Sequence, residues 1–227
     1  ELTAELTARR KQYEYYRELL LTFGDEVPKV TIGEILQSKG YIRGPFGSAL
    51  KKDYFIKDGI PIYEQQHAIN DSRSFRYFID RERANQLKRF MVKPNDLIIS
   101  CSGTIGKISI IRQNDPMGII NQALLILRLD LSKVIIKYVK YYLECFTNLI
   151  VTSSGGAITN IEKRAVIEKI QIPLPTLEEQ ERIVAILDRF DALCNDLTSG
   201  LPAEIEARQK QYEYYRDKLL SFKEVTA

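Results

Sequence analysis

The chain carries nearly the same segment twice, on either side of a different sequence. Residues 2–23 read LTAELTARRKQYEYYRELLLTF and residues 201–222 read LPAEIEARQKQYEYYRDKLLSF, so the two copies align without a gap at an offset of 199 residues. Fifteen of the 22 aligned positions are identical, including KQYEYYR in both copies. Such a repeat predicts a modular chain, in which one globular domain lies between two copies of one helix.

Both copies place apolar and aromatic residues along one helix seam. In the second copy the steps alternate between four and three residues, apart from one stutter around Leu201, and the seam extends back into the preceding segment. That seam consists of Ile183, Leu187, Phe190, Cys194, Leu197, Leu201, Ile205, Arg208, Tyr212, Tyr215, Leu219 and Phe222. In the first copy it consists of Leu2, Leu6, Arg9, Tyr13, Tyr16, Leu20 and Phe23. This spacing is typical of helices that pair lengthwise.

The stretch 177–222 would measure roughly 65–70 Å as one helix at 1.5 Å per residue. Gly200 and Pro202 predict a kink or break near residues 199–202, because proline lacks the backbone amide that a helix interior needs. The seam has two readings, as one face of a helix buried in its own domain or as a surface for pairing between helices. The duplication favours pairing, and one copy leads into the globular segment while the other leads out, so we expect an antiparallel arrangement. The expected pairing or docking residues are Tyr13, Tyr16, Leu20, Leu187, Phe190, Tyr212, Tyr215 and Leu219.

The predicted fold class is α+β, with one mixed globular domain flanked by long helices that form an antiparallel coiled coil. We place a helix at residues 1–23, the globular domain at 24–177 and the long helix at 178–227. Within the domain, patterning predicts helices at 31–38, 80–89 and 132–150, and strands at 60–65, 97–101, 107–112, 123–129 and 165–173. The strands at 97–101 and 107–112 should form a hairpin, because SGTIG between them is typical of a tight turn.

Charge is divided unevenly along the chain. Residues 24–177 hold 22 Lys+Arg against 15 Asp+Glu, a net charge of +7, whereas the flanking segments hold 11 against 15, a net charge of −4. This division indicates an anionic partner for the globular domain and a protein partner for the helices.

Several function classes find little support in the sequence. His67 is the one histidine, so neither a histidine metal cluster nor a Ser-His-Asp system can be assembled, and a lone histidine in a glutamine-rich turn is typical of a solvated residue. The glycine loops match neither GxGxxG nor a P-loop. Cys101, Cys145 and Cys194 have no motif spacing and are read as reduced thiols. We expect a non-catalytic cytoplasmic protein without a metal site.

Two polar segments are candidates for contact with nucleic acid. SGTIG at residues 102–106 is explained by a tight turn, or alternatively by backbone amides that meet phosphate oxygens together with Lys107. Residues 63–73, YEQQHAINDSR, form either a polar surface loop or a base-reading surface, because Gln, Asn and Arg can make paired hydrogen bonds to adenine and guanine edges.

Beyond these patterns, the chain resembles the specificity subunits of type I restriction–modification enzymes. The residues that carry the resemblance are GPFGSALKK at 44–52, DLIISCSGTIGKI at 96–108, NQ at 121–122, NI at 160–161, and above all IPLPTLEEQERIVAILD at 172–188 followed by the helix that contains QYEYYR. The resemblance covers essentially the whole chain, although the family pattern has two target recognition domains and this sequence holds one.

The resemblance implies a division of labour. Each recognition domain of the family reads one half of a bipartite DNA site, while the helices set the spacer length and dock two methyltransferase subunits, and through them the restriction subunit. A chain with one domain is then a half-subunit or a fragment, and it needs a second half-subunit or self-association. The resemblance also implies that S-adenosylmethionine, ATP and magnesium bind partner subunits and that this chain binds no cofactor. It further implies that the cytoplasm is that of a bacterium or an archaeon. The alternative is a helical adaptor that occupies the methyltransferase without reading DNA.

The expected DNA contacts follow from these two lines of reasoning. We expect phosphate contacts from Lys51, Lys52, Lys107 and Arg164. The candidate base readers are Gln65, Gln66, His67, Asn70 and Arg73, and Thr104 and Asn160 complete the predicted DNA-binding set.

Overall fold

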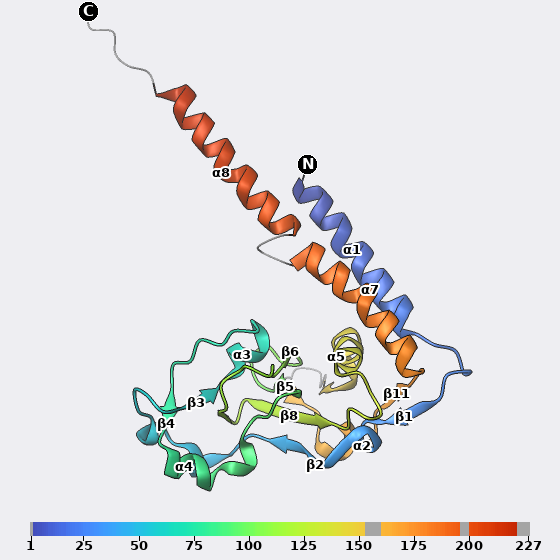
Figure 1. Cartoon of the computed structure of the whole chain (residues 1–227), viewed down its shortest axis with the longest axis vertical. Coiled ribbons are helices and arrows are strands. Elements are labelled where there is room, and N and C mark those ends of the chain that lie inside the picture. Colours follow the sequence, from blue (N-terminus) through green and yellow to red (C-terminus); the bar gives the residue numbers. More distant parts are fainter. Residues whose placement is uncertain (1, 153–159, 196–199, 222–227) are drawn as a thin grey trace, which may run out of the picture. The chain divides into compact units, whose positions relative to one another are not determined.

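The computed structural model describes residues 2–152, 160–195 and 200–221. The chain divides into two compact units (Figure 1). One is a globular unit, Phe23–Glu181, and the other is a helical unit made from Glu1–Thr22 together with Arg182–Ala227.

A four-stranded antiparallel sheet with strand order β2-β8-β5-β6 forms the centre of the globular unit. Its strands are β2 (Leu36–Arg43), β5 (Asp96–Ser100), β6 (Ile108–Ile110) and β8 (Leu124–Leu129). Every residue of β5 is buried, and so is every residue of β8 except Arg128. Both strands are covered on both faces, which explains why their sequences, DLIIS and LLILRL, are almost continuously apolar.

Smaller elements surround this sheet. Strand β3 (Ile60–Tyr63) pairs antiparallel with β4 (Phe78–Ile79) and parallel with β7 (Ile119–Ile120). The remaining strands form two antiparallel pairs, β1 (Lys29–Thr31) with β11 (Gln171–Pro173) and β9 (Val151–Thr152) with β10 (Asn160–Ile161). The short helices are α2 (Ile32–Ile35), α3 (Gln65–Ile69), α4 (Arg81–Gln86), α5 (Ile136–Cys145) and α6 (Arg164–Ile167). The 3₁₀ turns are η1 (Gly47–Leu50), η2 (Lys52–Tyr54), η3 (Lys88–Phe90) and η4 (Thr147–Leu149).

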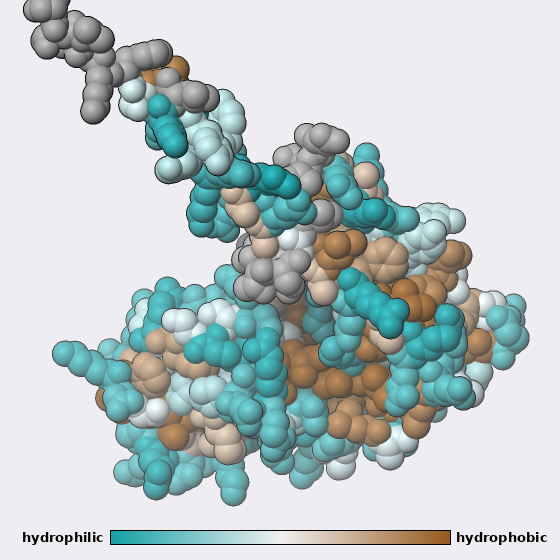
Figure 2. All heavy atoms as spheres, turned by 45° about the horizontal axis from the view of Figure 1, so that its top comes forward, coloured by the Kyte–Doolittle hydropathy of each residue, from teal (hydrophilic) through white to brown (hydrophobic). Residues whose placement is uncertain are grey.

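Two apolar clusters hold these elements together. The larger cluster joins the four-stranded sheet to β3, β7 and α3 and contains Ile42, Tyr63, Ala68, Val92, Ile98, Ile111, Ile120, Leu124 and Ile126. A second cluster packs α4 against β3, β4 and β7 through Ile62, Ile79, Ala84, Leu87 and Ile119. On the face that Figure 2 shows, the outer surface near β3 and β4 is mostly hydrophilic.

The structure confirms the predicted α+β class and the hairpin of β5 and β6, and it places α4 and η3 in the range predicted as one helix. Several predicted elements are wrong in extent. The helix predicted at 31–38 ends at Ile35, because Leu36 has an extended backbone and begins β2. Residues 165–173 are not one strand, because α6 precedes β11, and buried Ile167 and Ile170 follow a helical spacing of three. The helix predicted at 132–150 shrinks to α5, after which the Thr147 hydroxyl bonds the carbonyl oxygen of Glu144 at 3.0 Å.

In the helical unit, helix α1 (Leu2–Leu21) lies beside α7 (Leu177–Asn195), and the two run in opposite directions (Figure 1). The ring of Phe190 on α7 stacks on Tyr13 and Tyr16 of α1, with centroid distances of 6.2 and 5.7 Å. Leu20 is half-buried and Leu187 is buried. The predicted proximity of Tyr13, Tyr16 and Phe190 is therefore confirmed.

A third helix, α8 (Leu201–Leu220), begins where the break was predicted. Pro202 occupies its first turn, a position where a missing amide costs no helical hydrogen bond. Tyr212 and Tyr215, which repeat Tyr13 and Tyr16 of α1, are 63% and 51% exposed in this chain. The predicted docking residue Leu219 and the seam residue Leu197 have side chains outside the described part of the structure.

His67 belongs to the core, so its prediction as a solvated, base-reading residue is wrong. Its side chain is fully buried, and its ring stacks on Phe75 at a centroid distance of 4.7 Å. The amide of Glu64 donates to Nδ1 at 2.7 Å, which leaves Nε2 to donate to the carbonyl oxygen of Ser74 at 3.0 Å. Sequence alone did not show this burial, because the partner Ser74 follows a loop and reaches His67 only in the folded chain.

A buried ion pair fixes the two central strands to each other. Asp96 at the start of β5 is fully buried, and its two carboxylate oxygens accept hydrogen bonds from Nε and Nη2 of Arg128 on β8, both at 2.7 Å. The amide of Lys93 also donates to Asp96, at 2.7 Å. The carboxylate is therefore satisfied from two sides, which offsets part of the cost of its burial.

We predict that Asp96→Ala lowers the free energy of unfolding by about 3 kcal/mol, because it leaves the Arg128 guanidinium without its partner in a largely buried place. Urea denaturation of the variant measures this loss. The double variant Asp96→Ala, Arg128→Met should recover part of the stability. A single variant as stable as the parent chain would contradict the assigned role of the pair.

A second prediction concerns pH. Burial lowers the pKa of His67 from its ordinary value of 6.5, so the unfolded chain takes up a proton more readily than the folded chain. The stability that neutral His67 contributes is therefore fully present above about pH 6.5 and is lost as the pH falls below it. Between pH 7.5 and 5.5 the parent chain should lose more stability than His67→Gln, which cannot titrate. Equal losses in urea denaturation would show that His67 is not held neutral.

Candidate functional site

Two adjoining hollows of about 310 and 330 Å³ open on the surface of the globular unit and share Glu64, Arg76 and Asn121 among their lining residues. We call the pair the polar groove. Its polar side chains come from η2, from both ends of α3, from the loop before β4 and from the residues after β7: Lys52, Glu64, Gln65, Gln66, Asn70, Arg76, Asn121 and Gln122. The groove thus collects polar residues that are far apart in the sequence.

Helix α3 presents the glutamines to the groove. A capping box formed by Glu64 and His67 starts this helix directly after β3. Gln65 and Gln66 follow in its first turn and are half-buried, while Asn70 is the exposed residue that ends it. The predicted polar loop at 63–73 therefore contains a short helix whose buried side is anchored by His67 and Ala68.

Two glycines bring neighbouring loops up to the groove. A Cβ atom on Gly103 would lie 2.8 Å from Nε2 of Gln65, so the SGTIG turn borders α3. A Cβ atom on Gly44 would lie 1.9 Å from the carbonyl oxygen of Asn121, and the amide of Gly44 donates to the carbonyl oxygen of Leu124 at 3.0 Å. No side chain fits at position 44, which explains glycine at the entry to the GPFGS loop.

An ion pair crosses the groove. Arg76 donates from Nε and Nη2 to the two carboxylate oxygens of Glu64, at 3.1 and 2.9 Å. The Arg76 side chain is 61% exposed, whereas that of Glu64 is 12% exposed. The pair holds the guanidinium in one orientation at the surface. Sequence reasoning missed Arg76, although it lies only three residues beyond the polar run that was singled out.

Arg73, predicted as a base reader, serves the fold instead. Its side chain is 14% exposed and donates to Asp115 at 2.6 Å, to the carbonyl oxygen of Ile110 at 2.9 Å and to the Ser109 hydroxyl at 3.2 Å. The prediction for Arg73 is wrong, because the guanidinium nitrogens that would bond a base already donate to these acceptors. Ser109 lies in β6 and Asp115 follows it, so both are far from Arg73 in the sequence.

Several backbone groups of the SGTIG turn are hydrogen-bonded to the residues that flank it. The Ser100 hydroxyl donates to the carbonyl oxygen of Thr104 at 2.6 Å and accepts the amide of Lys107 at 2.9 Å. The amide of Gly106 donates to the carbonyl oxygen of Ser100 at 2.9 Å. The amides of Gly106 and Lys107 are thus not available to phosphate, and the tight-turn reading holds for this part of the turn. The side chains of Thr104 and Lys107 are exposed.

The predicted set does not form one site. Lys52, Gln65, Gln66 and Asn70 line the polar groove, and the turn that carries Thr104 borders it. Lys51 is exposed next to Lys52, but Arg164 lines a different hollow. The side chain of Asn160 lies outside the described part of the structure.

Other kinds of site receive no support from the described residues. No group of three or more His, Cys, Asp or Glu side chains among them could hold a metal ion, and no helix in that part of the chain is long and apolar enough to cross a membrane. Burial raises the pKa of the Cys101 thiol to about 12, so this thiol stays protonated near neutral pH and is a poor nucleophile.

Comparisons with known proteins identify the family of the chain. Residues 25–207 match the family model of the type I restriction modification DNA specificity domain. The chain is 36% identical to the specificity subunit of the type I restriction enzyme EcoR124I/EcoR124II of Escherichia coli, covering 98% of this chain and 55% of that protein. It is 34% identical to a putative type I specificity subunit, S.HindORF215P, of Haemophilus influenzae, covering 96% and 54%.

Solved structures show the same fold. The HsdS subunit from Thermoanaerobacter tengcongensis superposes with a TM-score of 0.64 at 19% identity, over 87% of this chain and 46% of that one. A chain from a type I R-M system, solved in a study of complex assembly and conformational transition, also reaches 0.64, at 20% identity and over 93% and 53%. The chain spans about half the length of these relatives and structures. By its match over most of its length, the chain belongs to the family of type I restriction–modification DNA specificity domains.

Proposed function

We propose that this chain is one half of a DNA-specificity subunit, which reads one half of a bipartite site in double-stranded DNA through the polar groove. The observation that carries the proposal is the convergence of amide and guanidinium side chains on one hollowed surface, in a member of a DNA-specificity family. Proteins read sequence mainly by hydrogen bonds to base edges, and such side chains supply them.

The chemistry of the groove fits the major groove of DNA. Gln65, Gln66 and Asn70 can each pair an amide oxygen and nitrogen with N6 and N7 of adenine. Arg76, held by Glu64, can pair with O6 and N7 of guanine, and its fixed orientation reduces the entropy lost on binding. We therefore add Arg76 to the reading set and remove His67 and Arg73.

Phosphate contacts from the margin would position the groove. Lys52 lines it and Lys51 is exposed beside Lys52, while Thr104 lies in the bordering turn and exposed Lys107 directly follows that turn. Contacts of this kind hold a protein in register on the duplex but carry no sequence information. This arrangement separates residues that set affinity from residues that set the half-site.

The helices have a separate role in the proposal. The stacking of Phe190 of α7 on Tyr13 and Tyr16 of α1 supports an antiparallel coiled coil, whose length would set the spacer between half-sites. Helix α8 would dock a methyltransferase subunit or the helices of a second half-subunit.

In this proposal the chain catalyses nothing, while S-adenosylmethionine, ATP and magnesium bind the methyltransferase and restriction subunits. The helical adaptor remains the second candidate, because the exposed face of α8 would serve it equally.

We predict that Gln66→Ala or Arg76→Ala costs roughly 1–3 kcal/mol of binding free energy on the cognate duplex and relaxes the preference at one base position. Lys107→Ala should weaken binding to all sequences and flatten the salt slope by about one unit. Sequencing of methylated motifs in a strain that carries the chain and its methyltransferase identifies the cognate site, and binding titrations give the affinities.

Variant Lys57→Ala is the control, since Lys57 is exposed and lines neither hollow of the groove. Unchanged preference in both groove variants would contradict the reading role. Methyltransferase binding without any preference among DNA sequences would favour the adaptor.

The exposed face of α8 yields a separate prediction. Tyr212→Lys with Tyr215→Lys should abolish self-association or methyltransferase capture, because charged side chains there oppose burial of the face. Solution mass and pull-down measure the two outcomes. Tyr214→Lys, also on α8 and 61% exposed but outside the seam, is the matched control. A double variant that keeps both the solution mass and the pull-down would refute the docking role.

A further inference from the structure

A hollow of about 680 Å³ lies on the globular unit and shares no lining residue with the polar groove. Six cationic side chains line it, and none of its lining residues is acidic. We call it the basic hollow and define it by these cations: Lys39, Lys88, Arg89, Lys93, Arg128 and Arg164. They come from β2, η3, the turn before β5, β8 and α6, so folding has assembled like charges that are distant in the sequence.

Two of the six cations have carboxylate partners, and the rest do not within the described residues. Arg128 pairs with buried Asp96, and Arg164 pairs with Glu168 at 2.8 Å. No ion pair within the described ranges joins Lys39, Lys88, Arg89 or Lys93 to a carboxylate. Like charges gathered without counter-charges repel one another, and binding of an anion would relieve that repulsion.

The backbone of β2 is distorted where it meets the hollow. Its pairing with β8 shifts register between Leu36 and Tyr41, which indicates a β-bulge. Lys39 in this bulge has a φ of 60°, a conformation that non-glycine residues adopt infrequently. A Cβ atom on the following residue, Gly40, would lie 2.5 Å from the carbonyl oxygen of Arg128, so glycine is required there. Bulges redirect side chains, and this one gives the hollow a lysine from an edge strand.

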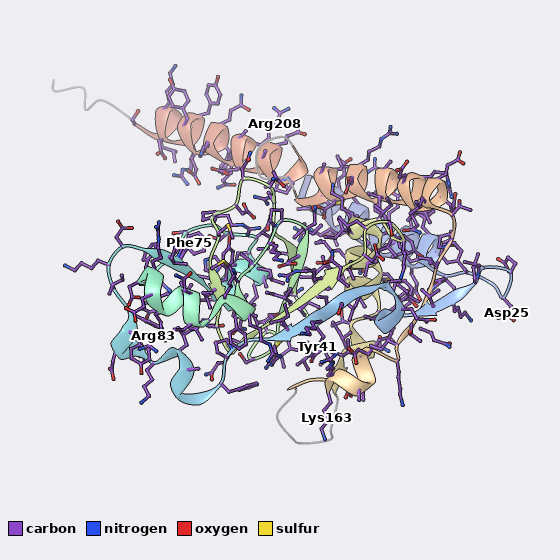
Figure 3. All side chains as sticks on the ribbon, turned by 60° about the horizontal axis from the view of Figure 1, so that its bottom comes forward. Asp25, Tyr41, Phe75, Arg83, Lys163 and Arg208 are labelled. Carbon is purple, nitrogen blue, oxygen red and sulfur yellow. The ribbon has the colours of Figure 1, made fainter. Side chains whose placement is uncertain are left out.

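Aromatic and aliphatic side chains also line the hollow. Tyr41 on β2 lies on the side of the globular unit that Figure 3 brings forward. The Arg164 guanidinium is 5.6 Å from the centre of the Tyr41 ring, and Ile42, Met91 and Met117 are further lining residues. Apolar lining strengthens the field of the cations beside it. The hollow therefore combines lysines that have no carboxylate partner among the described residues with apolar side chains, which screen charge less than water does.

We propose that the basic hollow binds the phosphate backbone of double-stranded DNA, as an anchoring surface separate from the bases read by the polar groove. This inference rests on the proposed function. Phosphates of one strand recur every 3.4 Å along the duplex axis, so a hollow with several lysines can meet more than one of them. Because phosphate contacts are independent of sequence, the hollow raises affinity for every duplex without changing the half-site.

The test compares two charge-matched variants of the full chain. Lys88→Gln with Lys93→Gln removes two exposed cations from the hollow, and Lys57→Gln with Lys169→Gln removes two exposed cations outside both surfaces. Each is titrated with cognate and random duplexes at several salt concentrations. The hollow variant should lose affinity by the same factor on both duplexes and flatten the salt slope by about two units. Its methylated motif should keep the parent half-site, and the control should keep the parent slope.

The outcomes separate this inference from the proposed function. A hollow variant with the slope of the control would overturn the inference, whatever the groove variants do. If the hollow variant flattens the slope while the groove variants keep full preference, the anchoring surface stands and the reading role of the groove fails. Titration with inorganic triphosphate tests a small anion instead: saturable binding that the hollow variant loses, with an unchanged DNA slope, would also overturn the inference.

Lys39→Asn gives an independent check that protects against misfolding. Asparagine tolerates a positive φ better than most residues, so the bulge should persist while the charge is lost. The expected result is a flattening of about one unit in the salt slope. A parent slope in a variant that unfolds at the parent urea concentration would count against the hollow.

Discussion

The globular unit depends on two strands, β5 and β8, that have no solvent-exposed face apart from Arg128. Such strands need apolar neighbours on both sides, and β3 with α3 supplies one of those sides. The Asp96–Arg128 pair locks the register of these strands, because a shift by one residue would separate the two charges inside the core. The loops and short elements that line the polar groove surround this pair of strands, and the basic hollow is lined partly by β2 and β8 of the same sheet.

The polar side chains of the globular unit fall into two groups, according to whether their hydrogen-bonding atoms have partners within the chain. His67 and Arg73 have their hydrogen-bonding atoms occupied by Ser74, Glu64 and Asp115, so they specify the structure. Lys88 and Lys93 are exposed and have no carboxylate partner among the described residues. Gln65 and Asn70 also face hollows. A residue type that can contact DNA is therefore a candidate only when the fold leaves part of its hydrogen-bonding edge exposed, as in Arg76, which pairs with Glu64 but is 61% exposed.

Local patterns explain which parts of the fold could be predicted. The hairpin of β5 and β6 follows from two apolar runs around SGTIG, and the break before α8 follows from Pro202. The roles of His67 and Arg73 could not be predicted, because their partners reach them through tertiary folding. The basic hollow could not be predicted for the same reason. The sequence shows the excess positive charge of the domain, but Lys39, Lys88 and Lys93 come to line one hollow only in the folded chain. The sequence therefore predicts the main elements and the charge distribution, whereas the role of each polar residue depends on its tertiary contacts.

The backbone contact between Gly44 and Asn121 brings together the two ends of a segment that includes the core strands β5 and β6. Most lining residues of the polar groove lie within this segment, whereas the contact itself involves backbone atoms and does not depend on the side chains that line the groove. Mutations of the exposed groove side chains can therefore alter the groove while the core strands and this contact stay in place. A surface of this kind can diverge quickly in evolution, because a new preference for DNA does not require a new fold.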